Sequence, residues 1–208
     1  FMATAAGTVK KTPLKDFSRP RASGIIAVEL MDGDRLVGVQ ITDGEREILL
    51  FSSGGKVIRF RESEVRAMGR VSRGVRGIRL GAEQEVIALI IADDGAVLTA
   101  SENGYGKRTA LDEFPRYGRG GQGVIAMQAS ERNGPLVGAV LVGEEDEIML
   151  ITNGGTLVRT RTAEVPVLGR NTQGVKLISL GGEERLVGMA CVAENGEEDE
   201  EDSEADAE

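Results

Sequence analysis

The sequence predicts an all-β fold, built as a propeller-like array of about four blades with four short strands in each blade. Three observations support this fold class. One pattern is written out four times at intervals close to 50 residues, each copy contains short apolar stretches separated by glycine-rich turns, and no segment shows a convincing 3.6-residue helical period. A repeat of this length is typical of radial arrays in which each repeat contributes one blade.

The repeat can be read from glycines that keep their phase along the chain. A first glycine opens each copy at steps of 48, 49 and 51 residues, at Gly7, Gly55, Gly104 and Gly155. Nine residues further on, each copy carries an acidic residue, at Asp16, Glu64, Glu113 and Glu164. A second glycine follows at Gly24, Gly74, Gly123 and Gly174. The predicted blades are therefore residues 1–46, 47–95, 96–146 and 147–193, followed by an acidic tail at 194–208.

The second copy shows most clearly the order of the elements within a repeat. Residues 48–51 and 56–60 flank the turn Ser-Ser-Gly-Gly, and the third and fourth copies place Asn-Gly there, so we expect a hairpin. A polar connection of about 14 residues leads to the second glycine. After that glycine, alternation predicts a strand that buries Val28, Ile78, Met127 and Ile178 along with Leu30, Leu80 and Leu180.

The final strand of each copy is apolar on both faces, which suits burial between neighbouring blades. Small residues recur inside these strands at intervals of 50, at Gly38, Ala88, Gly138 and Gly188. We interpret them as packing positions, because sheets crowd together toward the centre of a radial array.

Charge is distributed unevenly along the chain. The net charge is -9, yet residues 194–208 hold ten acidic groups and no basic one. The remaining chain has 25 basic and 24 acidic residues, a balance of +1. We expect the tail to be disordered, either competing with nucleic acid for a basic surface or simply aiding solubility. The sequence contains no targeting segment and no membrane-length apolar run, so we expect a soluble, cytoplasmic protein.

Several enzyme chemistries are excluded by residue type. The chain has no histidine, and its single cysteine, Cys191, occupies a core phase of the repeat. The four in-phase carboxylates are more simply turn caps or loop-fixing ion pairs than acid–base groups. Gly118, Gly120 and Gly123 form a literal G-x-G-x-x-G, but a strand-like stretch follows where a dinucleotide site needs a helix. We therefore expect no catalytic site, metal or cofactor in this chain.

The basic residues are periodic and concentrated in the hairpins and connections. If blades surround an axis, one phase of the repeat becomes one position on the rim, and a ring of cations can meet duplex phosphates without reading bases. A curved track also implies bent DNA. Arg35, Arg46, Arg132 and Arg185 fall outside this phase and are interpreted as solvated charges. The predicted DNA-binding residues are Lys10, Lys11, Arg19, Arg21, Arg59, Arg61, Arg66, Arg70, Arg73, Arg76, Lys107, Arg108, Arg116, Arg119, Arg159, Arg161 and Arg170.

With these motifs, above all TVKKT, VRAMGRVSRGVRGIRL, NGYGKRT and TLVRTR, the sequence resembles the C-terminal domain of DNA gyrase A over its whole folded part. The resemblance implies a strand-exchanged β-pinwheel of about six blades that wraps double-stranded DNA in a positive sense. It also implies a parent bacterial type II topoisomerase that introduces negative supercoils, associated with the nucleoid. The cleavage tyrosine and the site for ATP and Mg would then lie in other domains, and the partner would be the gyrase B subunit.

The sequence departs from that family in two respects. The heptad Q-R-R-G-G-K-G expected in the first blade is absent, and residues 117–123 are only a degenerate relative in a later blade. Four blades instead of six suggest that two lie upstream of Phe1, so we expect weaker DNA binding. The alternatives are the corresponding domain of topoisomerase IV and, in a different class, a propeller that serves as a protein-interaction platform. The platform is disfavoured because aromatic residues make up only 3% of the chain.

Overall fold

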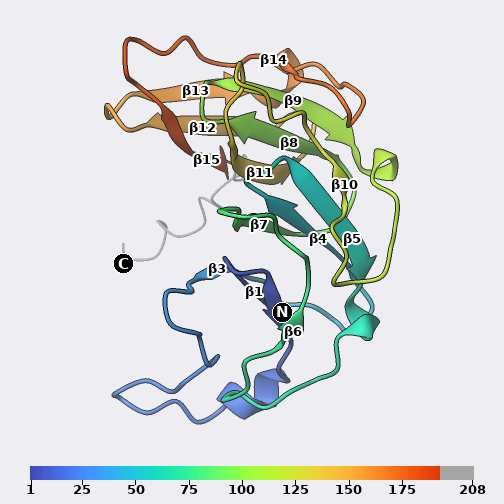
Figure 1. Ribbon diagram of the computed structural model, residues 1–208. Coiled ribbons are helices and arrows are strands. Elements are labelled where there is room, and N and C mark those ends of the chain that lie inside the picture. Colours follow the sequence, from blue (N-terminus) through green and yellow to red (C-terminus); the bar gives the residue numbers. More distant parts are fainter. Residues whose placement is uncertain (193–208) are drawn as a thin grey trace, which may run out of the picture.

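The structure is a computed structural model that describes residues 1–192, so the predicted acidic tail lies outside the described residues. Four antiparallel sheets follow one another along an open arc, from the first repeat (blue) to the fourth (orange and red) (Figure 1). The predicted all-β, propeller-like array is therefore confirmed. No helix in residues 1–192 has the length and apolar character needed to cross a membrane.

The first three sheets each run from an inner strand through a hairpin to a short outer strand. The first contains β3 (Leu36–Val39), β1 (Met2–Thr4), β2 (Thr8–Lys10) and β6 (Val75–Arg76). The second contains β7 (Val86–Ile91), β4 (Glu47–Ser52), β5 (Lys56–Arg61) and β10 (Val124–Ile125). The third contains β11 (Leu136–Val142), β8 (Ala96–Ser101), β9 (Tyr105–Ala110) and β14 (Val175–Lys176). The fourth contains β15 (Leu186–Val192), β12 (Glu147–Thr152) and β13 (Leu157–Arg161).

The outer strand of each complete sheet comes from the following repeat. Thus β6, which belongs to the second repeat, pairs with β2 of the first, and β10 and β14 repeat the exchange. Sheets and sequence repeats therefore do not coincide. Four strands per sheet are observed in three sheets, whereas the fourth has three because no described residue supplies its outer strand. Val28 and Leu30, predicted to be buried in such a strand, lie in residues 24–30, which form no strand and pair with no sheet, and Leu30 is 41% exposed.

The first glycine of each repeat makes this exchange possible. The carbonyl of Gly55 accepts hydrogen bonds from the N–H groups of Ala126 and Met127, at 2.9 and 3.2 Å. Gly55 has φ +78°, and a Cβ there would lie 2.4 Å from the Met127 carbonyl oxygen. Only glycine satisfies both the left-handed backbone and this close approach.

The hydrophobic core is divided among the gaps between neighbouring sheets. In β4, Ile48 and Leu50 enter the cluster shared with the first sheet, whereas Leu49 and Phe51 enter the cluster shared with the third. All four are fully buried. A strand with two buried faces loses its apolar–polar alternation, and this explains the continuous apolar runs in the sequence.

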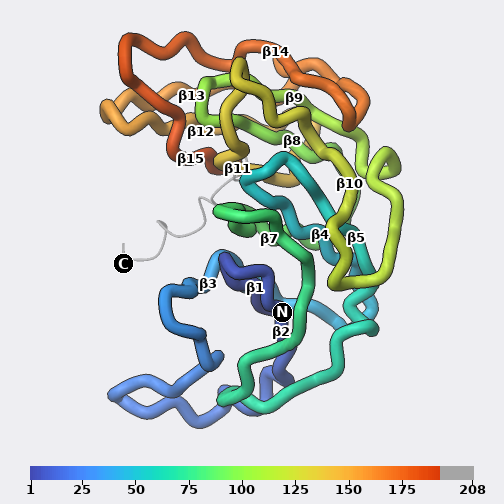
Figure 2. Tube along the Cα trace, viewed as in Figure 1, coloured from blue at the N-terminus to red at the C-terminus, as the bar shows by residue number. Residues whose placement is uncertain are grey.

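Small residues at Gly38 and Gly138 allow the inner strands to approach one another, as predicted for these positions. Strands β3, β7, β11 and β15 line the inner side of the curve, and consecutive inner strands are in contact (Figure 2). A Cβ at Gly38 would lie 2.9 Å from Cβ of Leu89 on the next inner strand, and one at Gly138 would lie 3.3 Å from Cβ of Met189. Leu89 of the second repeat thus covers Gly38 of the first, and Met189 of the fourth repeat covers Gly138 of the third.

Four short 3-10 helices, which the sequence did not predict, begin the polar connections. They are η1 (Leu14–Phe17), η2 (Glu62–Glu64), η3 (Leu111–Glu113) and η4 (Thr162–Glu164). The in-phase acidic residues lie within η1 or at the ends of η2–η4, and Glu64 accepts a hydrogen bond at 3.2 Å from the N–H of Arg61. For Glu64, this confirms the interpretation of the carboxylate as a turn-fixing group.

These contacts predict different outcomes for two glycines at the same phase. Gly38→Leu should lower the free energy of unfolding by about 1–3 kcal/mol, because the new side chain must displace Leu89. Gly188→Leu should change it by less than about 0.5 kcal/mol, since a Cβ there meets nothing within 4 Å among the described residues. Urea unfolding of both variants measures the difference, and equal losses would contradict the packing role of Gly38.

Candidate nucleic-acid interface

The polar connections lie in sequence along one side of the array. Isolated parallel bridges join Lys11 to Ala67, Arg59 to Arg116, and Arg108 to Val167. Each bridge places the connection of one repeat against the hairpin of the repeat before it. Each connection is therefore held next to the hairpin of the preceding repeat, and the basic residues of the two segments come close together.

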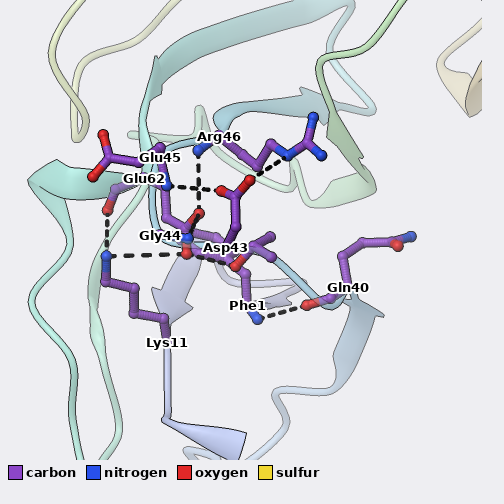
Figure 3. Close-up of polar contacts among 9 residues, drawn as sticks. Phe1, Lys11, Gln40, Asp43, Gly44, Glu45, Arg46 and Glu62 are labelled. Atoms are coloured by element: carbon purple, nitrogen blue, oxygen red, sulfur yellow. Dashed lines mark hydrogen bonds and ion pairs between the residues drawn. The ribbon is translucent and has the colours of Figure 1, made fainter.

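The cation four residues after the first glycine, however, joins neighbouring repeats. Arg59 donates to the carbonyl oxygens of Leu111 and Phe114, at 2.7 and 3.2 Å, and Arg108 donates to that of Val165 at 2.7 Å. Lys11 donates to the carbonyl of Glu62 at 3.1 Å (Figure 3). All three reach the 3-10 turn of the following repeat. Their prediction as phosphate contacts needs correction, since their donors are directed into the fold.

The first of these junctions contains the carboxylate of Glu62. It is buried and accepts hydrogen bonds from Thr42 Oγ1 at 2.5 Å, Gly44 N at 3.1 Å and Arg46 N at 3.4 Å. Lys11 Nζ lies 4.0 Å from the same carboxylate (Figure 3). A buried carboxylate with several donors is stabilised in place, so Glu62 is structural.

Lys10 and Lys107 are buried, and both were predicted to contact DNA. Lys107 Nζ donates to the carbonyls of Gly169 and Arg170 at 2.5 and 2.6 Å, and Lys10 Nζ donates to those of Ala27 and Arg70. Burial lowers the pKa of Lys10, with a smaller contribution from Arg70. Burial likewise lowers the pKa of Lys107 to about 8, although Glu113 acts in the opposite direction. Neither ammonium group has surface to offer a phosphate, so this part of the prediction is also corrected.

The arginine of each Gly-Arg pair links its connection to the one before. Arg70 Nη1 donates to the carbonyl of Ile26 at 2.8 Å, Arg119 Nη1 to that of Arg76 at 3.1 Å, and Arg170 Nη1 to that of Ile125 at 3.1 Å. The three acceptors share one phase of the repeat, two residues after the second glycine. These guanidinium groups remain at least partly exposed and keep donors for a ligand.

Three further predicted arginines are paired with carboxylates at the surface. Arg116 contacts Glu47 at 2.7 Å, Arg73 contacts Glu29 at 3.0 Å, and Arg159 contacts Glu147. Burial tends to raise the pKa of Glu47, but hydrogen bonds from Arg116 and Arg59 outweigh it and hold that pKa below its usual value. Exposed pairs of this kind are weak, so phosphate can compete for the arginines.

Six predicted arginines are exposed and have no side-chain partner among residues 1–192. Arg76 lies on the outer strand β6, and the others lie in connections or at strand ends. We call these six the free arginines: Arg19, Arg21, Arg61, Arg66, Arg76 and Arg161. They offer complete guanidinium groups for phosphate oxygens.

The sequence argument missed three exposed cations, Lys15 in η1, Lys176 and Arg79. Lys176 occupies the same phase as Arg76, and its Nζ lies 6.0 Å from the ring centroid of Tyr105. That shared phase was a signal that could have identified it. Arg79 is exposed just after β6, but Glu29, Gln128 and Ser179 hold its phase, so no repeat pattern pointed to it.

Other sequence interpretations can be compared with the structure. The G-x-G-x-x-G of residues 118–123 leads into the two-residue strand β10, as expected, and not into a helix. Cys191 is half-buried and packs against the third core cluster, and burial raises the pKa of its thiol. The prediction that Cys191 is a core residue is therefore supported by its packing.

Comparison with known proteins finds a family model and individual relatives that agree with one another. The model of the family described as "DNA gyrase C-terminal domain, beta-propeller" matches residues 1–43, 46–93, 96–142 and 146–193. DNA gyrase A of Pseudomonas aeruginosa is 63% identical over 203 residues, which cover 97% of this chain and 22% of that protein. DNA gyrase A of Escherichia coli is 55% identical over 204 residues, 98% of this chain and 23% of that protein. The chain thus spans about a fifth of the length of these relatives.

Solved structures agree with the sequence comparison. A DNA gyrase A C-terminal domain superposes with a TM-score of 0.82 at 26% identity, covering 92% of this chain and 64% of that one. A topoisomerase IV C-terminal domain superposes with a TM-score of 0.87 at 26% identity, covering 92% of this chain and 60% of that one. The shape alone therefore does not separate these two types of domain.

Burial of Lys107 predicts a pH-dependent contribution to stability. Between about pH 8 and its unfolded pKa of 10.5, the unfolded chain binds more protons at this residue, so stability rises with pH. Relative to Lys107→Met, the free energy of unfolding of the wild type should increase by about 3 kcal/mol from pH 7 to pH 10.5. Urea unfolding at several pH values measures this difference. Parallel curves for the two proteins would show that the ammonium is not destabilised by burial.

Proposed function

The chain belongs to the family of DNA gyrase C-terminal domains, and from this premise we propose that it binds and bends double-stranded DNA without sequence preference. DNA would lie along the surface formed by the connections and outer strands. There the free arginines contact phosphates, and the arginines of the Gly-Arg pairs add further donors. Binding by backbone contacts alone needs many cations on a curved surface, and the arc supplies both.

One observation carries this proposal: within residues 1–192 the free arginines are unpaired, whereas most other cations of the array have partners inside the fold. An unpaired guanidinium on a surface gains most from phosphate, because no internal hydrogen bond must be broken. They lie in the first, second and fourth repeats, and the exposed Arg119 of a Gly-Arg pair lies in the third, a spread suited to a continuous polyanion more than to a compact ligand.

The role of the whole protein is an extension of the same proposal. We place the chain in the A protein of a bacterial gyrase, an ATP-dependent type II topoisomerase that introduces negative supercoils, at the nucleoid in the cytoplasm. DNA cleavage and the chemistry of ATP and Mg would belong to other domains and to the gyrase B subunit. Identities of 55% and 63% to gyrase A proteins favour this assignment over topoisomerase IV.

A salt titration of DNA affinity tests the free arginines. The variant Arg61→Gln/Arg66→Gln/Arg161→Gln should bind a linear duplex more weakly and reduce the slope of log affinity against log salt by about 0.9 per lost phosphate contact. The matched control is Arg35→Gln/Arg46→Gln/Arg185→Gln, which removes the same charge at off-phase positions. Equal slopes for the two variants would show that net charge alone attracts DNA. A variant that loses DNA binding but still binds a protein partner would distinguish DNA binding from a role as a protein-interaction platform.

Residues 194–208 give a second test, based on charge alone. Removing their ten acidic groups should tighten DNA binding at low salt, because they compete with phosphates for the arginines. The effect should shrink as salt rises. Unchanged affinity at low salt would leave solubility as the role of the tail.

A further inference from the structure

The third repeat contributes none of the free arginines. Within it, Lys107 and Arg108 are buried, whereas Arg116 and Arg119 bond to groups inside the fold. A polyanion that follows the array would therefore meet no free arginine of the predicted set in this repeat. Arg132, interpreted from the sequence as a solvated charge, lies in this part of the array and is exposed.

The guanidinium group of Arg132 is held in place although it is exposed. Its Cζ atom lies 4.2 Å from the ring centroid of Tyr105, and its Nη1 donates to Gln173 Oε1 at 3.0 Å. A cation over an aromatic face is attracted by the ring. No carboxylate among residues 1–192 forms an ion pair with Arg132. The Nε and Nη2 donors of Arg132 are therefore left for a ligand.

The turn that carries Arg132 is fixed to the hairpin of its own repeat and to the connection of the next. Asn103 Nδ2 donates to the carbonyls of Glu131 and Arg132, at 3.2 and 3.0 Å. Asn133 is fully buried, and its Nδ2 donates to the carbonyl of Gln173 at 2.9 Å. Because the backbone and the guanidinium group are both held, Arg132 loses little conformational entropy when it binds a ligand.

Lys176 places a second cation beside the same ring. It lies on β14, where it is paired with Tyr105 of β9 at the outer edge of the third sheet (Figure 1). Its side chain is exposed, and its Nζ lies 6.0 Å from the ring centroid. Arg132 and Lys176 thus lie next to one aromatic side chain at the surface of the array.

The outer edges of the other two complete sheets also carry a cation at this position. In the first sheet Arg76 is paired with Thr8, and in the second Lys56 is paired with Ile125. The cation belongs to the outer strand in the first and third sheets, but to the hairpin in the second. A search by repeat phase alone cannot find such a row, because the row changes from one strand to the other.

We propose that Arg132 and Lys176 form a site for a backbone phosphate of double-stranded DNA, in which Tyr105 positions the guanidinium group of Arg132. The site rests on the proposed function and adds the outer edge of the third sheet to the DNA-binding surface. A planar guanidinium group can donate two parallel hydrogen bonds to one phosphate. Gln173 accepts only from Nη1, so Nε and Nη2 supply this pair of donors. Lys176 adds a point charge for the same or the next phosphate.

Substitutions of the ring test the positioning role, because they leave the charge of the protein unchanged. Tyr105→Leu should weaken binding of a linear duplex at low salt about 2–5-fold, since nothing then holds the guanidinium group over a ring face. Tyr105→Phe keeps the ring and should retain most of the affinity that Tyr105→Leu loses. Fluorescence anisotropy with a labelled duplex measures both affinities. Equal affinities for these two variants would contradict the role of Tyr105.

Substitutions of the cations test the phosphate contact itself. Arg132→Gln should weaken binding about tenfold and lower the slope of log affinity against log salt by about 0.9, and Lys176→Gln should lower the slope similarly. The matched control is Arg35→Gln, which removes the same charge from another exposed arginine outside the predicted set. Because Tyr105 acts through Arg132, Tyr105→Leu should have little further effect in the Arg132→Gln protein. Urea unfolding checks that every variant is folded.

The outcomes separate this site from the proposed function. If Arg132→Gln binds DNA as tightly as Arg35→Gln does, only net charge acts at this position and the site is overturned. If that result is found while Arg61→Gln/Arg66→Gln/Arg161→Gln loses affinity, the proposed function stands without this site. A wild type that shows no salt-dependent binding of DNA would overturn the proposed function and this site together.

Discussion

Each of the three junctions between neighbouring repeats in residues 1–192 depends on a hydrogen-bonded exchange, in which one glycine carbonyl accepts two N–H groups from the following repeat. The exchange requires a left-handed residue without a side chain, because the incoming backbone lies where a Cβ would be. It also makes the repeats mutually dependent, since an outer strand of two residues has no stability apart from the sheet it joins. The regular glycine phase in the sequence is the consequence of this constraint.

Most of the fold could be predicted because its determinants are local. Turn glycines, apolar strands and a fixed period are visible in any one repeat, and β4 and β5 lie within a residue or two of the predicted segments. The exchange of outer strands between repeats was predicted only through the family resemblance. Neither β6 nor β2 has a sequence feature that indicates its pairing with the other. The 3-10 turns were missed for a similar reason, since three residues are too few to establish a period.

The candidate interface was predicted less completely, and Lys10 and Arg61 show why. Both are basic residues of a hairpin strand, so the sequence argument assigned both to the DNA-binding cluster, although Lys10 lies three residues and Arg61 six residues after the first glycine of its repeat. In the structure, Lys10 reaches two carbonyls and is buried, whereas Arg61 is exposed and has no side-chain partner among the described residues. A lysine or arginine long enough to reach phosphate is also long enough to reach the carbonyls of the next repeat. Only the three-dimensional positions of those carbonyls distinguish the two uses.

Some cations join repeats by binding carbonyl groups, and others are exposed and can bind phosphates. These two groups of cations should respond differently to salt. The contacts that join repeats are backbone hydrogen bonds, apolar packing and buried cation–carbonyl bonds, which mobile ions reach poorly. Contacts between exposed arginines and phosphates are screened strongly, since they release counterions on binding. Raising the salt concentration should therefore release DNA while the arc keeps its shape. A surface of fixed curvature with screenable charges can thus bind and release DNA without being refolded in each cycle.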